Sequence, residues 1–165
     1  MRASNPDTPV TKQVFGLTVT QPPGTTRSLA YALVPNATES TLRSYQHGRL
    51  TLLANTPHLQ AVHHQGLRLT GVNTFTLGSH SIPGITVDGL ASLLIRRQGS
   101  AVTVAAADPT THRDTITVNL WAQYLRAAAD VPGVQVTRTV TGTRLTFTTR
   151  HRYGASLTVS LLPAW

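Results

Sequence analysis

Cysteine is absent from this 165-residue chain, and only one of its 14 basic residues, Lys12, is a lysine. Without cysteine, neither a disulfide framework nor a cysteine-based zinc site can form. No uninterrupted apolar run approaches the roughly 18 residues that a membrane-spanning helix needs. The opening residues, "MRASNPDTPVTKQVFG", also lack the apolar stretch of a signal peptide. We therefore expect no membrane span and no export signal within this sequence.

Acidic residues are few as well, and the net charge of the chain is +8. The arginines are scattered singly apart from the Arg96-Arg97 pair, so the chain has no basic tail. A positive balance raises the local concentration of polyanions, which include nucleic acids, anionic membranes and acidic polysaccharides. Charge alone does not choose among these three.

The aromatic content, 5%, argues against nucleic acid. Single-strand binders interleave arginine with exposed aromatic residues on a sheet face. In the segment 143–150, Leu145 and Phe147 alternate with polar residues and are expected in the core. We expect neither nucleic acid nor a membrane as a partner.

Threonine occurs 27 times and valine 15 times, and apolar residues alternate with polar ones in many short runs. This period of two is typical of half-buried β-strands. Strands about ten residues apart, separated by glycine, proline and asparagine turns, indicate an all-β antiparallel sandwich. The segment 28–34 is apolar on both faces and is predicted as an interior strand. The predicted strands cover residues 10–20, 28–34, 49–54, 58–64, 67–76, 90–97, 101–107, 114–120, 134–140, 143–149 and 156–162.

One helix of about ten residues is predicted in "PNATESTLRSYQHG". Asn36 is its expected N-cap, Glu39 completes a capping box, and Gly48 ends the helix. The segment 121–130 is ambiguous between a short helix and an ordered loop, because Trp121 and Leu125 have helical spacing.

Three histidines, His58, His63 and His64, crowd the stretch "LANTPHLQAVHH". A strand places His63 and His64 on opposite faces, so the two rings cannot bind one metal ion together. We predict that these histidines have no functional role and that the chain holds no metal and no cofactor.

A catalytic centre is not recognisable in the sequence. Asp88, Asp108 and Asp130 each adjoin turn-forming residues, which gives them structural uses. No carboxylate pair for glycoside hydrolysis is visible, and the chain has no G-x-S-x-G, P-loop, G-x-G-x-x-G or H-E-x-x-H motif. We predict no catalytic residue in this chain.

Several segments resemble the C-terminal portion of polysaccharide lyase family 8, which comprises hyaluronate, chondroitin AC and xanthan lyases. They follow one another in the family's order over residues 10–110, with a weaker similarity at 153–162. The segments are "VTKQVFGLTV", "LAYALVPNAT", "LTLLANTPHLQAVHH", "GVNTFT", "LASLLIRRQGSAVTVAAADPT" and "YGASLTVSLL".

The resemblance implies a division into two parts. Residues 1–50 would be the last strands and helix of a central β-sandwich, and residues 51–165 a smaller C-terminal β-sandwich. The stretch around "LANTPHLQAVHH" would then mark the boundary between them.

The resemblance also implies a function. Family members cleave uronic-acid-containing glycans by β-elimination, using residues of an upstream helical domain that map to no position here. We therefore expect a secreted parent protein whose catalytic helical domain is the partner of this chain, and an isolated chain without activity.

An anionic polysaccharide is the expected ligand. The candidate substrate-binding residues are Arg96 and Arg97 by charge, and Trp121 and Tyr124 as aromatic sugar platforms. Tyr153 and Trp165 are further aromatic candidates, although all four aromatic residues could instead close the ends of the sandwich. A free-standing carbohydrate-binding module and a structural interaction domain that docks through residues 28–34 remain alternatives.

Overall fold

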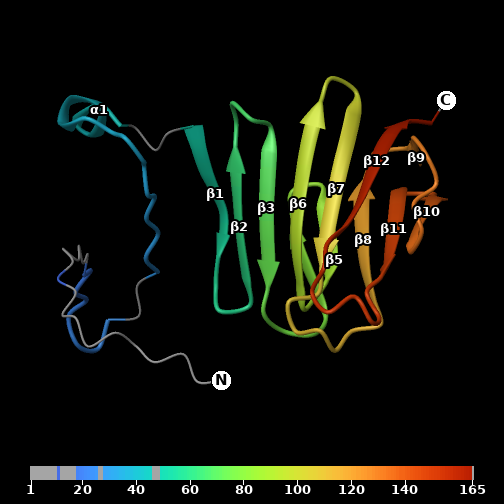
Figure 1. The fold of residues 1–165 in the computed structure, drawn as a ribbon, viewed down its shortest axis with the longest axis horizontal. Helices are drawn as coiled ribbons and strands as arrows, with labels where there is room; N and C mark the ends of the chain where they lie inside the picture. The colour runs from blue at the N-terminus through green and yellow to red at the C-terminus, as the bar shows by residue number, and fades with distance from the viewer. Residues whose placement is uncertain (1–10, 12–17, 26–27, 46–48, 165) are drawn as a thin grey trace.

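The computed structural model describes residues 11, 18–25, 28–45 and 49–164, and two antiparallel sheets stacked on each other dominate it (Figure 1). One short helix, α1 (Glu39–Arg43), precedes the sheets and lies away from them. In the described part of the chain, no helix has the length and hydropathy to cross a membrane. The structure confirms the predicted all-β antiparallel sandwich.

Seven strands form one sheet, in the order β1-β2-β3-β6-β7-β12-β9, and five form the other, in the order β10-β11-β8-β5-β4. Half of the neighbouring pairs are consecutive in the chain and are joined by short turns. Because the pairings are antiparallel, consecutive turns lie at alternate ends of the sandwich. The strands are β1 (Leu50–Asn55), β2 (Leu59–His64), β3 (Leu69–Thr74), β4 (Ser79–Ile82), β5 (Ile85–Asp88), β6 (Ala91–Gln98), β7 (Ala101–Ala107), β8 (Thr115–Trp121), β9 (Leu125–Ala127), β10 (Val134–Thr139), β11 (Gly142–Thr148) and β12 (Leu157–Pro163).

Alternate side chains of the facing strands build a single core. Ile116, Val118 and Leu120 of β8 are fully buried, as are Leu145 and Phe147 of β11. Their neighbours in sequence are mostly polar and face outward, which is the period-2 pattern that the sequence shows. The predicted core positions in β11 are therefore confirmed.

Three strands were not expected from the sequence. The hairpin of β4 and β5 turns at Pro83-Gly84, and each of its strands has four residues. Strand β9 has three residues and pairs with the end of β12. Segments this short carry too little alternation to be recognised by periodicity.

The prediction of an interior strand at 28–34 is wrong. The segment forms no strand, and Tyr31 and Leu33 are 74% and 78% exposed. Two hydrogen bonds join it to Asn55 of β1: the Ser28 hydroxyl donates to the Asn55 carbonyl over 3.2 Å, and Asn55 Nδ2 donates to the Leu29 carbonyl over 3.2 Å. An apolar segment needs a sheet on both sides to be buried, and the described part of the chain supplies none. The predicted strand at 10–20 falls mostly outside the described residues, and residues 18–20 are not in a strand.

Helix α1 (Glu39–Arg43) is half as long as predicted and begins two residues later. Its N-cap is Thr38, whose hydroxyl accepts a hydrogen bond from the Thr41 N–H over 3.2 Å. Asn36 has a φ of 56° and shapes the turn before the helix, so its predicted capping role is wrong. The helix ends at Ser44, and the predicted stop at Gly48 lies outside the described residues.

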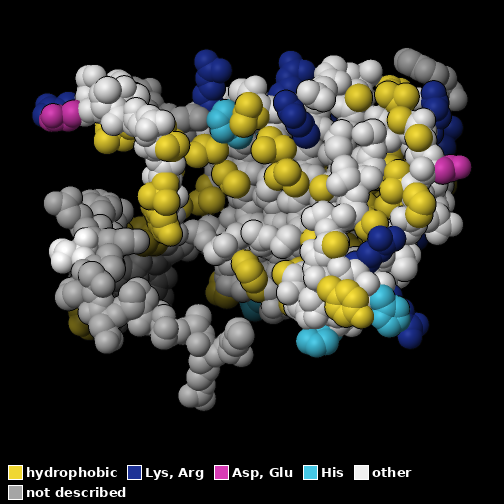
Figure 2. Space-filling view, viewed as in Figure 1, with side chains coloured by type: hydrophobic (Ala, Val, Ile, Leu, Met, Phe, Trp, Pro, Cys, Tyr) yellow, Lys and Arg dark blue, Asp and Glu magenta, His cyan; other side chains and the backbone are white. Residues whose placement is uncertain are grey.

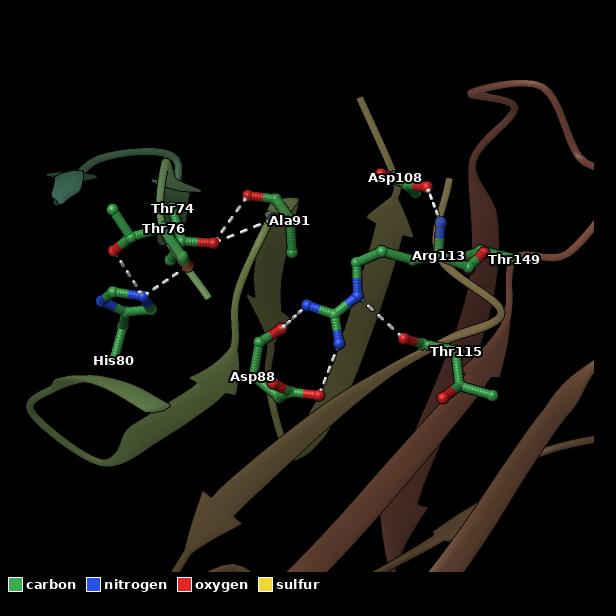
Figure 3. A network of polar contacts seen from close by, with 9 residues as sticks. All are labelled: Thr74, Thr76, His80, Asp88, Ala91, Asp108, Arg113, Thr115 and Thr149. Carbon is green, nitrogen blue, oxygen red and sulfur yellow. Dashed lines mark hydrogen bonds and ion pairs between the residues drawn. The ribbon is translucent and has the colours of Figure 1, made fainter. Parts of the chain in front are cut away.

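A polar network closes the end of the sandwich where β5 and β7 finish (Figure 3). The buried Asp108 carboxylate accepts hydrogen bonds from the Thr110 N–H at 2.9 Å, the Thr110 hydroxyl at 2.6 Å and the Arg113 N–H at 2.7 Å. Burial favours the neutral acid, but these donors outweigh it and hold the pKa of Asp108 below its ordinary value. The turn role expected for Asp108 is confirmed.

Arg113 extends this network to the second sheet. Its Nη2 lies 2.6 Å from Asp88 Oδ2, and its Nε donates to the Thr115 carbonyl over 3.1 Å. The Thr149 hydroxyl, after β11, donates to the Arg113 carbonyl over 2.8 Å. Loops from both sheets are thereby fixed to one another.

Replacing Asp108 with asparagine is expected to lower the free energy of unfolding by about 1–3 kcal/mol at neutral pH, because two buried N–H groups lose charged acceptors. A depressed pKa means that this stabilisation is present above the ordinary carboxyl pKa of about 3.9. It is lost as the pH falls through the lower pKa of the folded state. Urea unfolding of both proteins across this range should show their stabilities converging in acid.

Asp114→Asn is the matched control, since the Asp114 side chain is 74% exposed and lies 3.7 Å from Arg150. A loss in Asp114→Asn equal to that in Asp108→Asn would contradict the role assigned to the buried carboxylate.

Candidate functional site

The end of the sandwich opposite the Asp108 network carries a chain of contacts between the two sheets. Arg97, near the end of β6, is half-buried, and its Nη1 donates to Gln123 Oε1 over 2.7 Å. The Arg97 N–H donates to the carbonyl of Arg68 over 3.0 Å, which ties β6 to the turn between β2 and β3. Arg97 thus links this turn to the loop that follows β8.

Tyr124 continues the chain of contacts. Its hydroxyl donates to the Val140 carbonyl over 3.1 Å, and its own carbonyl accepts from the Ala164 N–H over 2.9 Å. The guanidinium carbon of Arg138, on β10, lies 5.1 Å from the centre of the Tyr124 ring, within range of a cation–π interaction. We call these five residues, Arg68, Arg97, Gln123, Tyr124 and Arg138, the arginine rim.

The rim is electropositive because its arginines lack acidic partners. The ion pairs found in the described part of the chain lie elsewhere, and none involves a rim arginine. Three carboxylates stand at the far end, where β5 and β7 finish and β8 begins: Asp88, Asp108 and Asp114. Figure 2 shows basic side chains standing along the upper edge of the sandwich.

One rim residue, Arg68, and Ala122, which precedes the rim residue Gln123, have left-handed backbone conformations that non-glycine residues rarely adopt. Arg68 has a φ of 49°, and Ala122, beside Gln123, has a φ of 55°. Such conformations cost about 1 kcal/mol or more each and persist where neighbours impose them. The Arg97 N–H bond to the Arg68 carbonyl and a 2.8 Å bond from the Ala122 N–H to the Thr141 carbonyl supply that constraint. The rim backbone is therefore preorganised.

The four substrate-binding candidates chosen from the sequence do not form one site. Arg97 and Tyr124 meet at the rim through Gln123. Arg96 alternates with Arg97 and points outward from the seven-stranded sheet, where it is exposed. Trp121 lies on the outer face of the other sheet, where its indole N–H donates to the Thr86 hydroxyl over 2.7 Å.

The remaining aromatic candidates lie elsewhere. Tyr153 is 81% exposed at the end that carries the Asp108 network, so it does not plug the sandwich. Trp165 lies outside the described residues. The segment 121–130 forms the end of β8, an ordered loop and β9, so the helical alternative is wrong.

Sequence reasoning missed Arg68, Gln123 and Arg138. The order of the turns could have identified these residues, because successive turns between antiparallel strands lie at opposite ends of the sandwich. The turn after β2, the end of β6 and the loop after β8 all fall at the same end under this rule.

The histidines of β2 have structural hydrogen bonds. His63 Nδ1 pairs with the Thr70 hydroxyl at 2.9 Å on the adjacent strand, and His64 Nδ1 accepts from the Leu67 N–H over 3.1 Å in the turn. Within the described ranges, no three His, Asp or Glu side chains gather as they would around a metal ion.

The rim offers guanidinium groups and an aromatic ring. This arrangement suits the binding of carboxylate or sulfate groups, since planar guanidinium groups form charged hydrogen bonds with both.

Comparison with known proteins places the sandwich in a family. Residues 51–117 match the model described as "Polysaccharide lyase family 8, C-terminal beta-sandwich domain". The hyaluronate lyase HylB of Enterococcus faecalis is 28% identical over 111 residues, which cover 67% of this chain and 11% of that protein. The chain thus spans about a ninth of the length of this curated relative.

Solved structures share the fold. A Paenibacillus xanthan lyase aligns with a TM-score of 0.74 and 21% identity over 80% of this chain and 13% of its own. A chondroitin AC lyase of Streptomyces coelicolor, solved with chondroitin sulphate, aligns with a TM-score of 0.67 and 23% identity over 79% of this chain and 17% of its own. Residues 51–117 thus match the C-terminal β-sandwich domain of polysaccharide lyase family 8, and the solved lyase structures share the fold of the chain.

Proposed function

We propose that this chain is the non-catalytic β-sandwich part of a secreted polysaccharide lyase that degrades anionic, uronic-acid-containing glycans by β-elimination. It packs against a catalytic helical domain and contributes to the substrate cleft. The observation that carries the proposal is the arginine rim, a preorganised, electropositive surface on a family 8 domain. Related proteins whose names specify hyaluronate, xanthan and chondroitin as substrates support the choice of an anionic glycan.

The rim supports glycan binding through both charge and shape. Guanidinium groups without carboxylate partners are free to pair with uronates or sulfates, and they attract a polyanion over longer distances. The hydrogen bond of Arg97 to Gln123 and the stacking of Arg138 on Tyr124 hold two of these groups in place. Fixed side chains lose less conformational entropy when they bind.

The supporting role rests on a row of apolar side chains across the outer face of the seven-stranded sheet. Leu52 pairs with Val62, Val62 with Gly71, and Gly71 with Leu94, so the four residues lie in one line across β1, β2, β3 and β6. Leu52, Val62 and Leu94 are 54%, 39% and 48% exposed. We call this line the apolar row.

A hollow of about 1050 Å³ lies between this face and the residues that precede the sheet, including Tyr31 and Tyr45. An uncovered apolar face beside an uncovered apolar segment is a typical protein-binding surface. It is where another part of the lyase would pack. The same surface favours a structural interaction domain as the alternative if no glycan binds.

A free-standing carbohydrate-binding module is the second candidate. The high exposure of Tyr153 favours it, because sugar-binding modules present aromatic rings to the solvent. Retention by neutral glycans would distinguish this candidate from the first.

The purified chain is expected to leave hyaluronan, chondroitin and xanthan uncleaved. β-Elimination leaves an unsaturated product that absorbs ultraviolet light, so absorbance during incubation gives a direct measurement. A commercial lyase of the same family in parallel reactions provides the positive control. A rise in absorbance with the chain alone would overturn its non-catalytic assignment.

Binding should depend on the rim. In affinity electrophoresis with hyaluronan or chondroitin sulfate in the gel, the wild-type chain should be retarded, and Arg97→Gln should weaken binding roughly tenfold, the usual size of a lost charged hydrogen bond. Arg150→Gln is the control, because it removes the same charge near Asp114 at the other end. Equal effects of the two substitutions would mean that net charge, and not the rim, causes retardation. Absence of retardation in the wild type would remove the glycan-binding role.

The isolated chain should self-associate through the apolar row. Sedimentation velocity at increasing protein concentration should show association of the wild type, and the double substitution Leu52→Thr and Leu94→Thr should give a monomer. Threonine keeps the β-propensity of these outward positions. Substituting Thr117→Ser and Thr158→Ser on outward positions of other strands controls for general surface changes. A wild-type chain that stays monomeric would argue against the docking role.

A further inference from the structure

A second concavity lies at the open side of the sandwich, between the edge strands of the two sheets. Strand β9 ends the seven-stranded sheet and β10 ends the five-stranded sheet, so within the described residues neither has a partner on its outer side. Between them is a pocket of about 370 Å³, whose wall also includes Val131 in the connecting loop and Val159 of β12. We call it the edge pocket.

The floor of the edge pocket is apolar. Val134 and Val136 of β10 are half-buried and face inward, and they meet the buried Leu125 of β9 and Val159 of β12. Because β9 has only three residues, the two sheets do not close on each other here. The floor is continuous with the hydrophobic core.

Charged groups surround this floor. Arg138 belongs to the same inward row of β10 as the two valines, and the Tyr124 ring holds its guanidinium at 5.1 Å. Arg126 and Asp130 are the other charged residues that line the pocket. Among the described residues, none of these three forms an ion pair. The pocket therefore carries a net positive charge beside an apolar surface.

We propose that the edge pocket binds a single uronate residue of the anionic glycan. Arg138, with Arg126, binds the carboxylate, and the valines contact an apolar face of the sugar ring. Outward backbone groups of the edge strands β9 and β10, with Asp130, supply partners for hydroxyl groups. This assignment rests on the proposed function and adds a defined subsite to it.

Size and composition agree with this ligand. Small-molecule sites have volumes of about 300–1000 Å³ and combine an apolar lining with a few placed polar groups. The volume of the edge pocket is at the lower limit of that range, which suits one sugar residue more than an oligosaccharide. An arginine already stacked on an aromatic ring also loses little freedom when it binds a carboxylate.

The probe is glucuronate, with glucose as the neutral control, titrated into the ¹⁵N-labelled chain. Glucuronate should shift the amide resonances of β9, β10 and the loop between them, and glucose should not. Arg138→Gln should weaken glucuronate binding at least about tenfold, whereas Arg150→Gln should leave it unchanged. Thermal unfolding of both variants should show that each is folded.

A second variant tests the cavity without removing charge. Ala127→Leu adds bulk where β9 lines the pocket and should abolish the glucuronate shifts. It should leave the retardation of the chain by hyaluronan, which depends on Arg97, intact.

Three results would each overturn the edge pocket and leave the rim proposal standing. They are glucuronate shifts confined to the Arg68–Arg97 end, equal shifts with glucose, and unchanged glucuronate binding in Arg138→Gln. If hyaluronan does not retard the wild type at all, the proposed function itself fails. The two failures are therefore distinguishable.

Discussion

Phe147, Leu145 and Leu120 have no solvent exposure because the inward faces of the two sheets close on each other. Full burial of each such side chain contributes about 1.5–3 kcal/mol, so sheet stacking is the main source of stability. It commits every second residue of a strand to the core, and leaves the outer faces, the edges and the two ends for function. The apolar row lies on an outer face, the edge pocket at an edge and the arginine rim at one end, and Arg138 belongs to both the rim and the pocket.

The two ends of the sandwich use their charges differently. At one end, the Asp108 carboxylate accepts three hydrogen bonds from its own loop, and Arg113 forms an ion pair with Asp88. At the other end, Arg97 and Arg138 are held by an amide and an aromatic ring, which leave their positive charge uncompensated. Asp88, Asp108 and Asp114 lie at the other end of the sandwich. This separation gives a chain with few acidic residues a distinct electropositive surface.

Sequence alternation predicted most of the sandwich because burial on one face of a strand repeats every second residue. The prediction failed where burial depends on contacts with residues distant in sequence. The segment 28–34 is apolar on both faces, which signals two covering layers, yet Tyr31 and Leu33 are exposed in this chain. The prediction of the site failed because it grouped residues that are adjacent in sequence. Arg96 and Arg97 are neighbours in sequence but face opposite sides of β6. Arg138 contacts Tyr124 from another strand, and the sequence spacing of the two residues does not indicate this contact.

The proposed surfaces can act at the same time because the sheet order separates them. The apolar row covers β1, β2, β3 and β6 from one edge of the seven-stranded sheet, whereas the edge pocket lies at β9, the other edge. Arg97, near the end of β6, contacts Gln123 in the loop between β8 and β9, at the end of the sandwich. A domain docked on the apolar row would therefore leave the rim and the pocket open. Under the proposed function, a glycan chain emerging from that domain would meet the arginine rim at the end of the sandwich before it reaches the edge pocket.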